Sequence, residues 1–84
     1  MTMDDKALLE RIVVNPAILS GKPVIRGTRL SVEFVLNLLG HGADIGEIVD
    51  EYKGVTPDDI KACLLFAGES ISRTEFMPLV SETA

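Results

Sequence analysis

Two side chains, His41 and Cys63, are the first candidates for catalysis, because each is the only residue of its kind in the sequence. Nucleophilic catalysis needs a thiol or hydroxyl beside a general base, and a bound metal ion needs several ligands. One histidine and one cysteine do not convincingly supply either set. His41 precedes Gly42 at a predicted helix end, where an imidazole can bond unpaired carbonyls, and Cys63 falls on an apolar stripe. We therefore expect no enzymatic activity, no metal and no cofactor.

The neighbouring carboxylates Asp58 and Asp59 could also take part in acid–base chemistry. Adjacent residues of a helix point about 100° apart, however, and acids in a first turn stabilise the positive end of the helix dipole. Gly21-Lys22-Pro23 and Gly27-Thr28 are superficially similar to parts of a phosphate-binding loop, but no GK[ST] motif leads from a strand into a helix. The sequence gives nucleotide binding no support.

Basic and acidic residues are segregated along the chain. Residues 11–30 carry four basic residues and no acid, whereas residues 31–60 carry one lysine against seven acids. A basic surface could contact DNA phosphates. The candidates for such contacts are Lys22, Arg26, Arg29 and Lys61. The net charge of −5 argues against DNA binding, and a simple solvated surface is the alternative for these charges.

The length of 84 residues, with 46% hydrophobic and 25% charged residues, predicts one globular domain with little room for a ligand cavity. The apolar runs are far shorter than the roughly 20 residues that cross a bilayer, so a membrane protein is not expected. A single cysteine forms no disulfide within the chain and, with no secretory segment, suits a cytoplasmic location. We divide the sequence into an arm or loose helix (1–10), one domain (11–71) and a tail (72–84).

The first part of the domain predicts a small antiparallel hairpin. Residues 11–14 are mostly β-branched and end at the turn dipeptide Asn15-Pro16. A second extended run covers residues 24–26, and Gly27 permits the positive φ of a tight reversal. Pro23 has no N–H group to donate, so it belongs at a sheet edge or at the first position of its strand.

Three short helices are predicted after the hairpin. Ser31 is the expected N-cap of a helix over 32–40, and Asp44 with Glu47 has the spacing of a capping box for a second helix that ends before Gly54. A third helix begins after the N-cap Thr56, with Pro57 in its first turn. Its predicted core positions are Ile60, Cys63, Leu64, Ala67 and Ile71. The fold class is therefore mainly α, with a β-hairpin leading a three-helix bundle, and the last two helices have a helix-turn-helix outline.

The third helix also carries apolar residues away from its predicted core stripe. On a helical wheel Ala62, Leu65 and Phe66 fall on a second face. Such a face favours a partner, and we expect a homodimer centred on Leu65 and Phe66. The alternative is that these residues pack under the tail of the same chain.

The tail presents the same choice between a partner and the chain's own domain. Pro78 argues against a stable isolated helix, so the apolar groups around it need a surface. The tail residues assigned to a partner interface are Arg73, Phe76, Met77 and Leu79. Folding back onto the third helix is the alternative.

Several motifs together resemble one known family, domain-of-unknown-function family 433. They are Arg11-Ile12, Asn15-Pro16, the run from Gly21 to Arg29 (GKPVIRGTR), Val32, Gly42, Glu47-Ile48, Tyr52, and Thr56 to Ile60 followed by residues 62–67. The run GKPVIRGTR is quite specific, and the resemblance covers about residues 11–68. Ser31 stands where the family often has proline, Gly46 weakens the second helix, and Lys53-Gly54 replaces a common proline. None of these departures threatens the fold.

The resemblance implies a homeodomain-like three-helix domain led by a hairpin, and an antitoxin-like partner of PIN-type ribonucleases. We therefore expect a non-enzymatic antitoxin that binds a PIN-like nuclease toxin and could also bind its operator DNA. A plain helix-turn-helix regulator without a toxin is the second hypothesis, and the negative net charge makes it weaker. A small enzyme or an oligomeric scaffold is the third.

Overall fold

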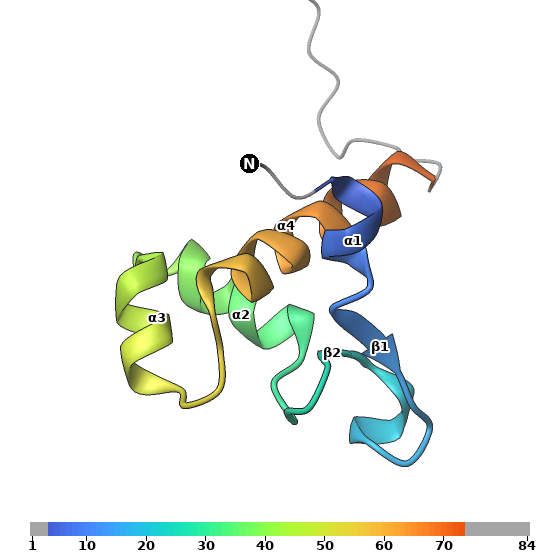
Figure 1. The fold of residues 1–84 in the computed structure, drawn as a ribbon, viewed down its shortest axis with the longest axis horizontal. Helices are drawn as coiled ribbons and strands as arrows, with labels where there is room; N and C mark the ends of the chain where they lie inside the picture. Colours follow the sequence, from blue (N-terminus) through green and yellow to red (C-terminus); the bar gives the residue numbers. More distant parts are fainter. Residues whose placement is uncertain (1–3, 74–84) are drawn as a thin grey trace, which may run out of the picture.

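The computed structural model describes residues 4–73 and confirms the predicted fold class, which is mainly helical with a small antiparallel hairpin followed by three helices (Figure 1). One further short helix precedes the hairpin. The elements in chain order are α1 (Asp5–Leu9), β1 (Ile12–Val14), the 3₁₀ turn η1 (Leu19–Gly21), β2 (Pro23–Ile25), α2 (Val32–Gly40), α3 (Ile45–Glu51) and α4 (Pro57–Ser72).

The hairpin pairs β1 with β2 in one register, in which Val13 lies opposite Val24. Pro23 occupies the first position of β2, as predicted from its missing N–H group. Gly27 has a φ of +80°, and the amide of Thr28 donates to the carbonyl of Ile25 across the turn. This is the hydrogen bond of a type II turn, which requires a positive φ at its third residue. The chain then runs back along β2 and enters α2.

Side-chain caps begin the three predicted helices at the predicted residues. Ser31 Oγ accepts the Phe34 amide at 3.0 Å, and Asp44 and Glu47 form the expected capping box of α3. Thr56 and Asp59 form a second capping box at the start of α4. Each capping box bonds backbone amides that have no partner within the helix. Because the two residues of a box are only three positions apart, the start of each helix can be predicted from the sequence.

The core lies where β2, α2, α3 and α4 meet. Its buried residues come from every one of these elements and from the turn before α4. They are Ile25, Val32, Val35, Ile48, Val55, Ile60 and Cys63. The rings of Phe34 on α2 and Tyr52, just after α3, meet edge to face with their centroids 5.7 Å apart. This contact links α3 to α2.

The predicted core face of α4 is partly wrong. Ile60 and Cys63 are buried as expected, but Leu64 is 48% exposed and Ile71 is 64% exposed. Ala62, which we had placed on an outer face, is completely buried, and Phe66 packs against the core. The buried face of α4 is thus rotated away from Leu64, toward the side that α1 and β1 cover.

Helix α1 supplies much of that cover. It packs against α4, and its Leu8 is 8% exposed (Figure 1). Asp4 caps α1 by accepting the amide of Ala7 at 2.8 Å. The predicted choice between an arm and a loose helix is therefore settled for residues 5–9, which form a docked helix.

Candidate functional site

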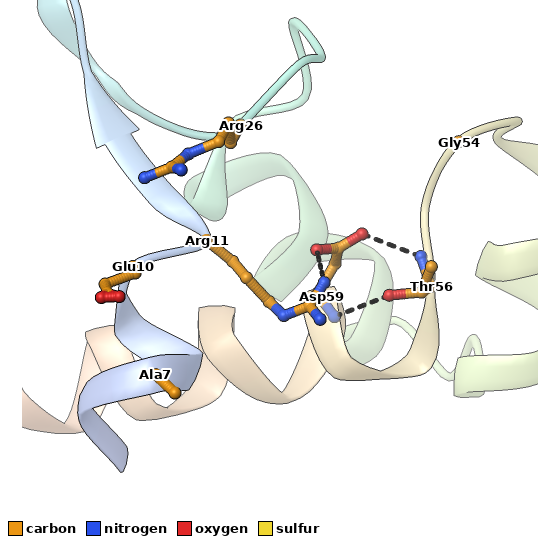
Figure 2. Close-up of a pocket in the computed structure, with 7 residues that line it drawn as sticks. All are labelled: Ala7, Glu10, Arg11, Arg26, Gly54, Thr56 and Asp59. Carbon is orange, nitrogen blue, oxygen red and sulfur yellow. Dashed lines mark hydrogen bonds and ion pairs between the residues drawn. The ribbon is translucent and has the colours of Figure 1, made fainter. Parts of the chain in front are cut away.

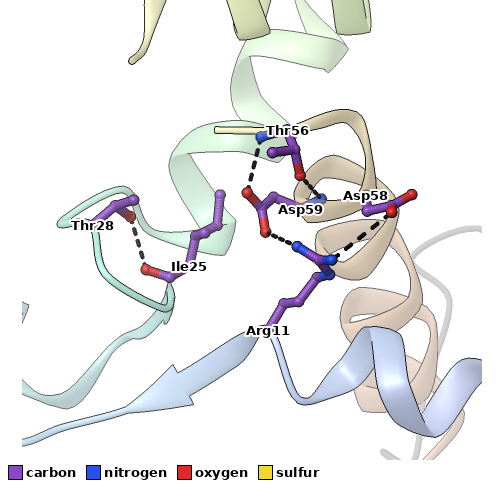
Figure 3. A network of polar contacts seen from close by, with 6 residues as sticks. All are labelled: Arg11, Ile25, Thr28, Thr56, Asp58 and Asp59. Carbon is purple, nitrogen blue, oxygen red and sulfur yellow. Dashed lines mark hydrogen bonds and ion pairs between the residues drawn. The ribbon is translucent and has the colours of Figure 1, made fainter. Parts of the chain in front are cut away.

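The most extensive polar contact joins Arg11, just before β1, to the start of α4 (Figure 3). Arg11 Nη1 donates to Asp59 Oδ1 at 3.1 Å, and Nη2 lies 3.9 Å from Asp58 Oδ2. The second oxygen of Asp59 accepts the Thr56 amide at 2.9 Å. Asp59 is 6% exposed, so its charge needs these partners. The acids that we considered for catalysis therefore hold the hairpin and the helix together.

A polar hollow of about 510 Å³ lies beside this ion pair (Figure 2). Two arginines and two carboxylates line it, so its formal charges balance. The lining residues are Ala7, Glu10, Arg11, Arg26, Gly54, Thr56 and Asp59. The Thr56 hydroxyl already accepts the Asp59 amide at 3.3 Å and Asp59 is paired with Arg11, so neither group is an activated nucleophile or base.

A second, apolar groove of about 630 Å³ lies between α2 and the C-terminal half of α4. Its apolar walls come from Val32 and Leu36 on α2 and from Phe66, Ala67 and Ile71 on α4. Pro23 extends it toward the hairpin, and polar groups such as Asn37, His41 and Ser70 lie along it. An open apolar surface of this kind is suited to another apolar chain segment.

The four predicted DNA-contacting residues are dispersed over the hairpin, the loop before α2 and α4. Lys22 Nζ lies 2.9 Å from Glu33 Oε1, so its charge is neutralised by α2. Arg26 lines the polar hollow, whereas Arg29 and Lys61 are simply exposed. Among the described residues Arg26, Arg29 and Lys61 make no ion pair.

The predicted interface residues divide into three groups. Leu65 and Phe66 are half-buried, and Phe66 packs on the core and also lines the apolar groove, which corrects its assignment to an outer face. Arg73 caps the end of α4 and pairs with Glu69 at 3.2 Å. The other members, Phe76, Met77 and Leu79, lie outside the described residues.

His41 and Cys63 have the structural positions predicted for them. His41 Nδ1 lies 2.8 Å from the Asn37 carbonyl at the end of α2. Burial, helped by the negative charge of Asp59, raises the pKa of the Cys63 thiol to about 11. This thiol is therefore protonated and weakly nucleophilic at neutral pH. Within residues 4–73 no cluster of three or more histidine, cysteine, aspartate or glutamate side chains could hold a metal ion.

The roles of two residues in these sites were not predicted from the sequence. Arg11 was assigned to a basic run, to the first strand and to a family motif, and Ile71 was assigned to the core. No local pattern indicates that Arg11 pairs with Asp59, which lies 48 positions later in the sequence. Nothing local distinguishes Ile71 from a core residue. Separately, none of the described helices has the length and apolar character needed to cross a membrane.

Comparison with known proteins agrees with the fold. A family model described as "Protein of unknown function (DUF433)" matches residues 12–67, more than half of the chain. The chain is also similar to the crystal structure of a DUF433 member protein from Anabaena variabilis ATCC 29413, with 25% sequence identity and a TM-score of 0.71. That match covers 81% of this chain and 67% of the other. No curated protein matches this sequence.

Proposed function

The chain belongs to the DUF433 family, as its motifs predicted, and on this premise we propose that it is a non-enzymatic, antitoxin-like protein that binds and neutralises a PIN-type ribonuclease. The observation that carries the proposal is the apolar groove between α2 and α4. The class of partner comes from the family resemblance. The groove gives that partner a place to bind.

The groove favours a protein partner because apolar side chains of α2 and α4 make up most of its surface, with polar groups along it. Helical and extended protein segments bind in such grooves through a few apolar anchors. Ile71, at 64% exposure, stands at the open end of one wall, where a partner side chain would cover it. Burying an apolar side chain of this size against a partner stabilises the complex.

Arg73 offers an electrostatic contribution to inhibition. A PIN-type active site is a cluster of metal-binding carboxylates, and a guanidinium binds carboxylates in a bidentate manner. The pair between Arg73 and Glu69 is an exposed i,i+4 pair, which is worth only a few tenths of a kcal/mol. Arg73 can therefore exchange Glu69 for a nuclease carboxylate at little cost. In this proposal the apolar groove holds the nuclease while Arg73 neutralises its active site.

Operator DNA is the second ligand in this proposal, and a plain DNA-binding regulator is the alternative function. The element order favours DNA binding, because α3, a short turn and α4 follow each other as in a helix-turn-helix. In addition, Arg11 balances the charge of Asp59 at the start of α4. The repulsion of phosphate that two acids would cause is thereby reduced. Arg26 and Arg29, and Lys61 on α4, are the exposed bases for such contacts.

We place this activity in the cytoplasm, since a chain with a single cysteine forms no disulfide of its own and suits a reducing compartment. The expected homodimer stays part of the proposal. With Phe66 packed against the core, Leu65 is left as the centre of such a contact.

Binding to a PIN-type nuclease encoded next to this chain's gene tests the proposal. The purified chain should bind that nuclease and stop it from cleaving RNA in a titration. Ile71→Asp should weaken binding by about 100-fold or more, because it places an unpaired charge in an apolar contact. Leu64→Asp is the matched control, since Leu64 is also exposed on α4 but does not line the groove. Equal effects of the two variants, or no binding at all, would contradict the proposed function.

A further inference from the structure

One edge of β1 is left open by the part of the chain that the structure describes. The amide of Arg26 donates to the carbonyl of Arg11 at 2.8 Å, so Arg11 and Val13, alternate residues of the chain, bond toward β2. The residues between and after them, Ile12 and Val14, direct their N–H and C=O groups away from β2. No residue within 4–73 hydrogen-bonds to these outward groups.

The other edge of the sheet is already used. The amide of Ile25 on β2 donates to the carbonyl of Leu30 at 3.0 Å, and Val24 forms a bridge with Ser31, just before α2. The chain therefore covers the edge of β2 with its own next segment. Within residues 4–73, the edge of β1 is the place where a further strand can pair.

The open edge lacks the residues that usually prevent strand pairing. Exposed edges are commonly protected by charged side chains, by proline or by a bulge. Residues 12–14 read IVV, with no charge and no proline, and Val14 is 60% exposed. The charge that precedes them, Arg11, is bound to Asp58 and Asp59 of its own chain (Figure 3). An incoming strand therefore meets β-branched apolar side chains along the whole of β1.

We propose that this edge pairs with β1 of a second copy of the chain, about a two-fold axis at Val13, so that the two hairpins form one continuous antiparallel sheet. Two-fold contacts use the same surface on both copies. With Val13 opposite the partner's Val13, Ile12 lies opposite the partner's Val14. Each such pair exchanges two hydrogen bonds through the groups that point outward.

The neighbouring registers are blocked by their own residues. An axis at Val14 would place Ile12 opposite Pro16, which has no N–H group to donate. An axis at Ile12 would place Val14 opposite Glu10, whose amide is already bonded at the end of α1. The register centred on Val13 is therefore the one in which Ile12 and Val14 use all their outward groups.

The paired strands are a small contact by themselves, because β1 has three residues and stable interfaces bury about 800 Å² on each partner. Leu65, the residue expected at the dimer contact, lies about two helical turns from Asp58 on the same side of α4. Asp58 in turn meets Arg11 beside β1. Leu65 therefore extends the contact that the strands position. The inference names the surface of the homodimer in the proposed function and rests on that part alone.

Amide hydrogen exchange followed by NMR tests the pairing in the natural chain. In the monomer the Ile12 and Val14 amides are open to water, whereas the Val13 amide is bonded to β2 and reports that the hairpin is folded. When about nine-tenths of the chain is dimeric by light scattering, exchange at Ile12 and Val14 should be about tenfold slower, since only the monomer exchanges. Unchanged exchange at both amides would give the dimer to another surface and overturn the proposal. A chain that stays monomeric would also overturn it.

A proline at position 14 tests the hydrogen bonds themselves. Val14→Pro removes an outward N–H group and spares the bonds to β2, and it favours the extended backbone that Val13 already has. Two symmetry-related bonds are lost, so the dissociation constant of the dimer should rise about tenfold or more. Val14→Thr is the matched control, because it keeps both the N–H group and the branched side chain. Equal dissociation constants for the two variants would overturn the proposal, and if Val14→Pro fails to fold, exchange in the natural chain decides.

The nuclease titration separates this inference from the rest of the proposed function. The apolar groove lies between α2 and α4, and no residue of β1 lines it. If the chain binds no nuclease while Ile12 and Val14 are protected in the dimer, the nuclease proposal fails and the strand pairing stands. If the nuclease is inhibited while these amides exchange at the monomer rate in the dimer, the strand pairing alone fails.

Discussion

Arg11 Nη1 lies 3.1 Å from Asp59 Oδ1, across 48 positions of sequence. The same Asp59 closes the capping box of α4 through Thr56. One carboxylate thus links the strand β1, the turn before α4 and the helix itself. The pair therefore joins the first strand to the last described helix.

Removing the arginine should destabilise the fold. Arg11→Ala leaves the nearly buried Asp59 without its cation, and we expect a loss of about 2 kcal/mol in the free energy of unfolding measured with urea. Lys22→Ala is the control, because the Lys22–Glu33 pair is exposed and such pairs contribute about 0–1 kcal/mol. Losses of the same size in both variants would show that Asp59 needs no cation.

Two glycine substitutions should act in opposite directions. Gly27→Ala forces a side chain into a φ of +80° and should cost about 1 kcal/mol or more, although a Cβ there meets no atom within 4 Å. Gly68→Ala, also in open space but inside α4, should stabilise the chain by roughly 0.5–1 kcal/mol. Thermal unfolding of the two variants checks both signs. A stabilised Gly27→Ala would mean that the turn does not need its positive φ.

Alkaline pH should weaken the fold through Cys63. Because burial raises the thiol pKa from 9.0 to about 11, the folded state keeps its proton where the unfolded state loses it. The resulting stability is complete below pH 9 and is lost as the pH rises through 11. Urea unfolding at pH 8 and pH 10.5 should show a larger fall for the natural chain than for Cys63→Ala. Parallel falls in the two chains would assign the alkaline loss to other groups.

DNA binding, where it occurs, should depend on the hairpin and the loop after it. Changing Lys22, Arg26 and Arg29 together to alanine should reduce affinity for the chain's own upstream DNA and lower the salt slope. Each lost phosphate contact removes about one unit of slope. Because Lys22 is paired with Glu33, we expect most of the change from the two arginines. Fluorescence anisotropy at several salt concentrations measures it, and an unaltered slope would exclude these residues.

Self-association should respond to Leu65. Leu65→Asp should convert a dimer to a monomer in light scattering, because the charge would be buried without a partner. Phe66 is not a suitable test residue, since it also packs against the core and its replacement would destabilise the fold itself. A natural chain that is already monomeric would end the dimer hypothesis.

The helix starts could be predicted because their determinants are local. Ser31, Asp44 and Thr56 each bond an amide three residues ahead, so the residue types and their spacing suffice. Gly27 and Pro23 were predictable for the same reason. Their backbone constraints belong to the residue itself.

The orientation of α4 could not be predicted in this way. Which face it buries depends on α1, which lies some fifty positions earlier and which the sequence left as an arm or a loose helix. Apolar residues on two faces of α4 gave two stripes of similar strength, and the pattern alone does not say which one is covered. The apolar groove could not be predicted either, since it forms only where α4 packs beside α2.

The contact of α1 and β1 with α4 sets an order of events during synthesis on the ribosome. These first elements are synthesised before their packing surface exists, because α4 follows them by some fifty positions. Until Asp59 emerges, Arg11 has no buried partner and Leu8 has no helix to cover it. The nascent chain therefore cannot complete its fold by adding finished pieces in turn. The docking of α1 and β1 must follow the synthesis of α4, and long-range contacts of this kind slow folding.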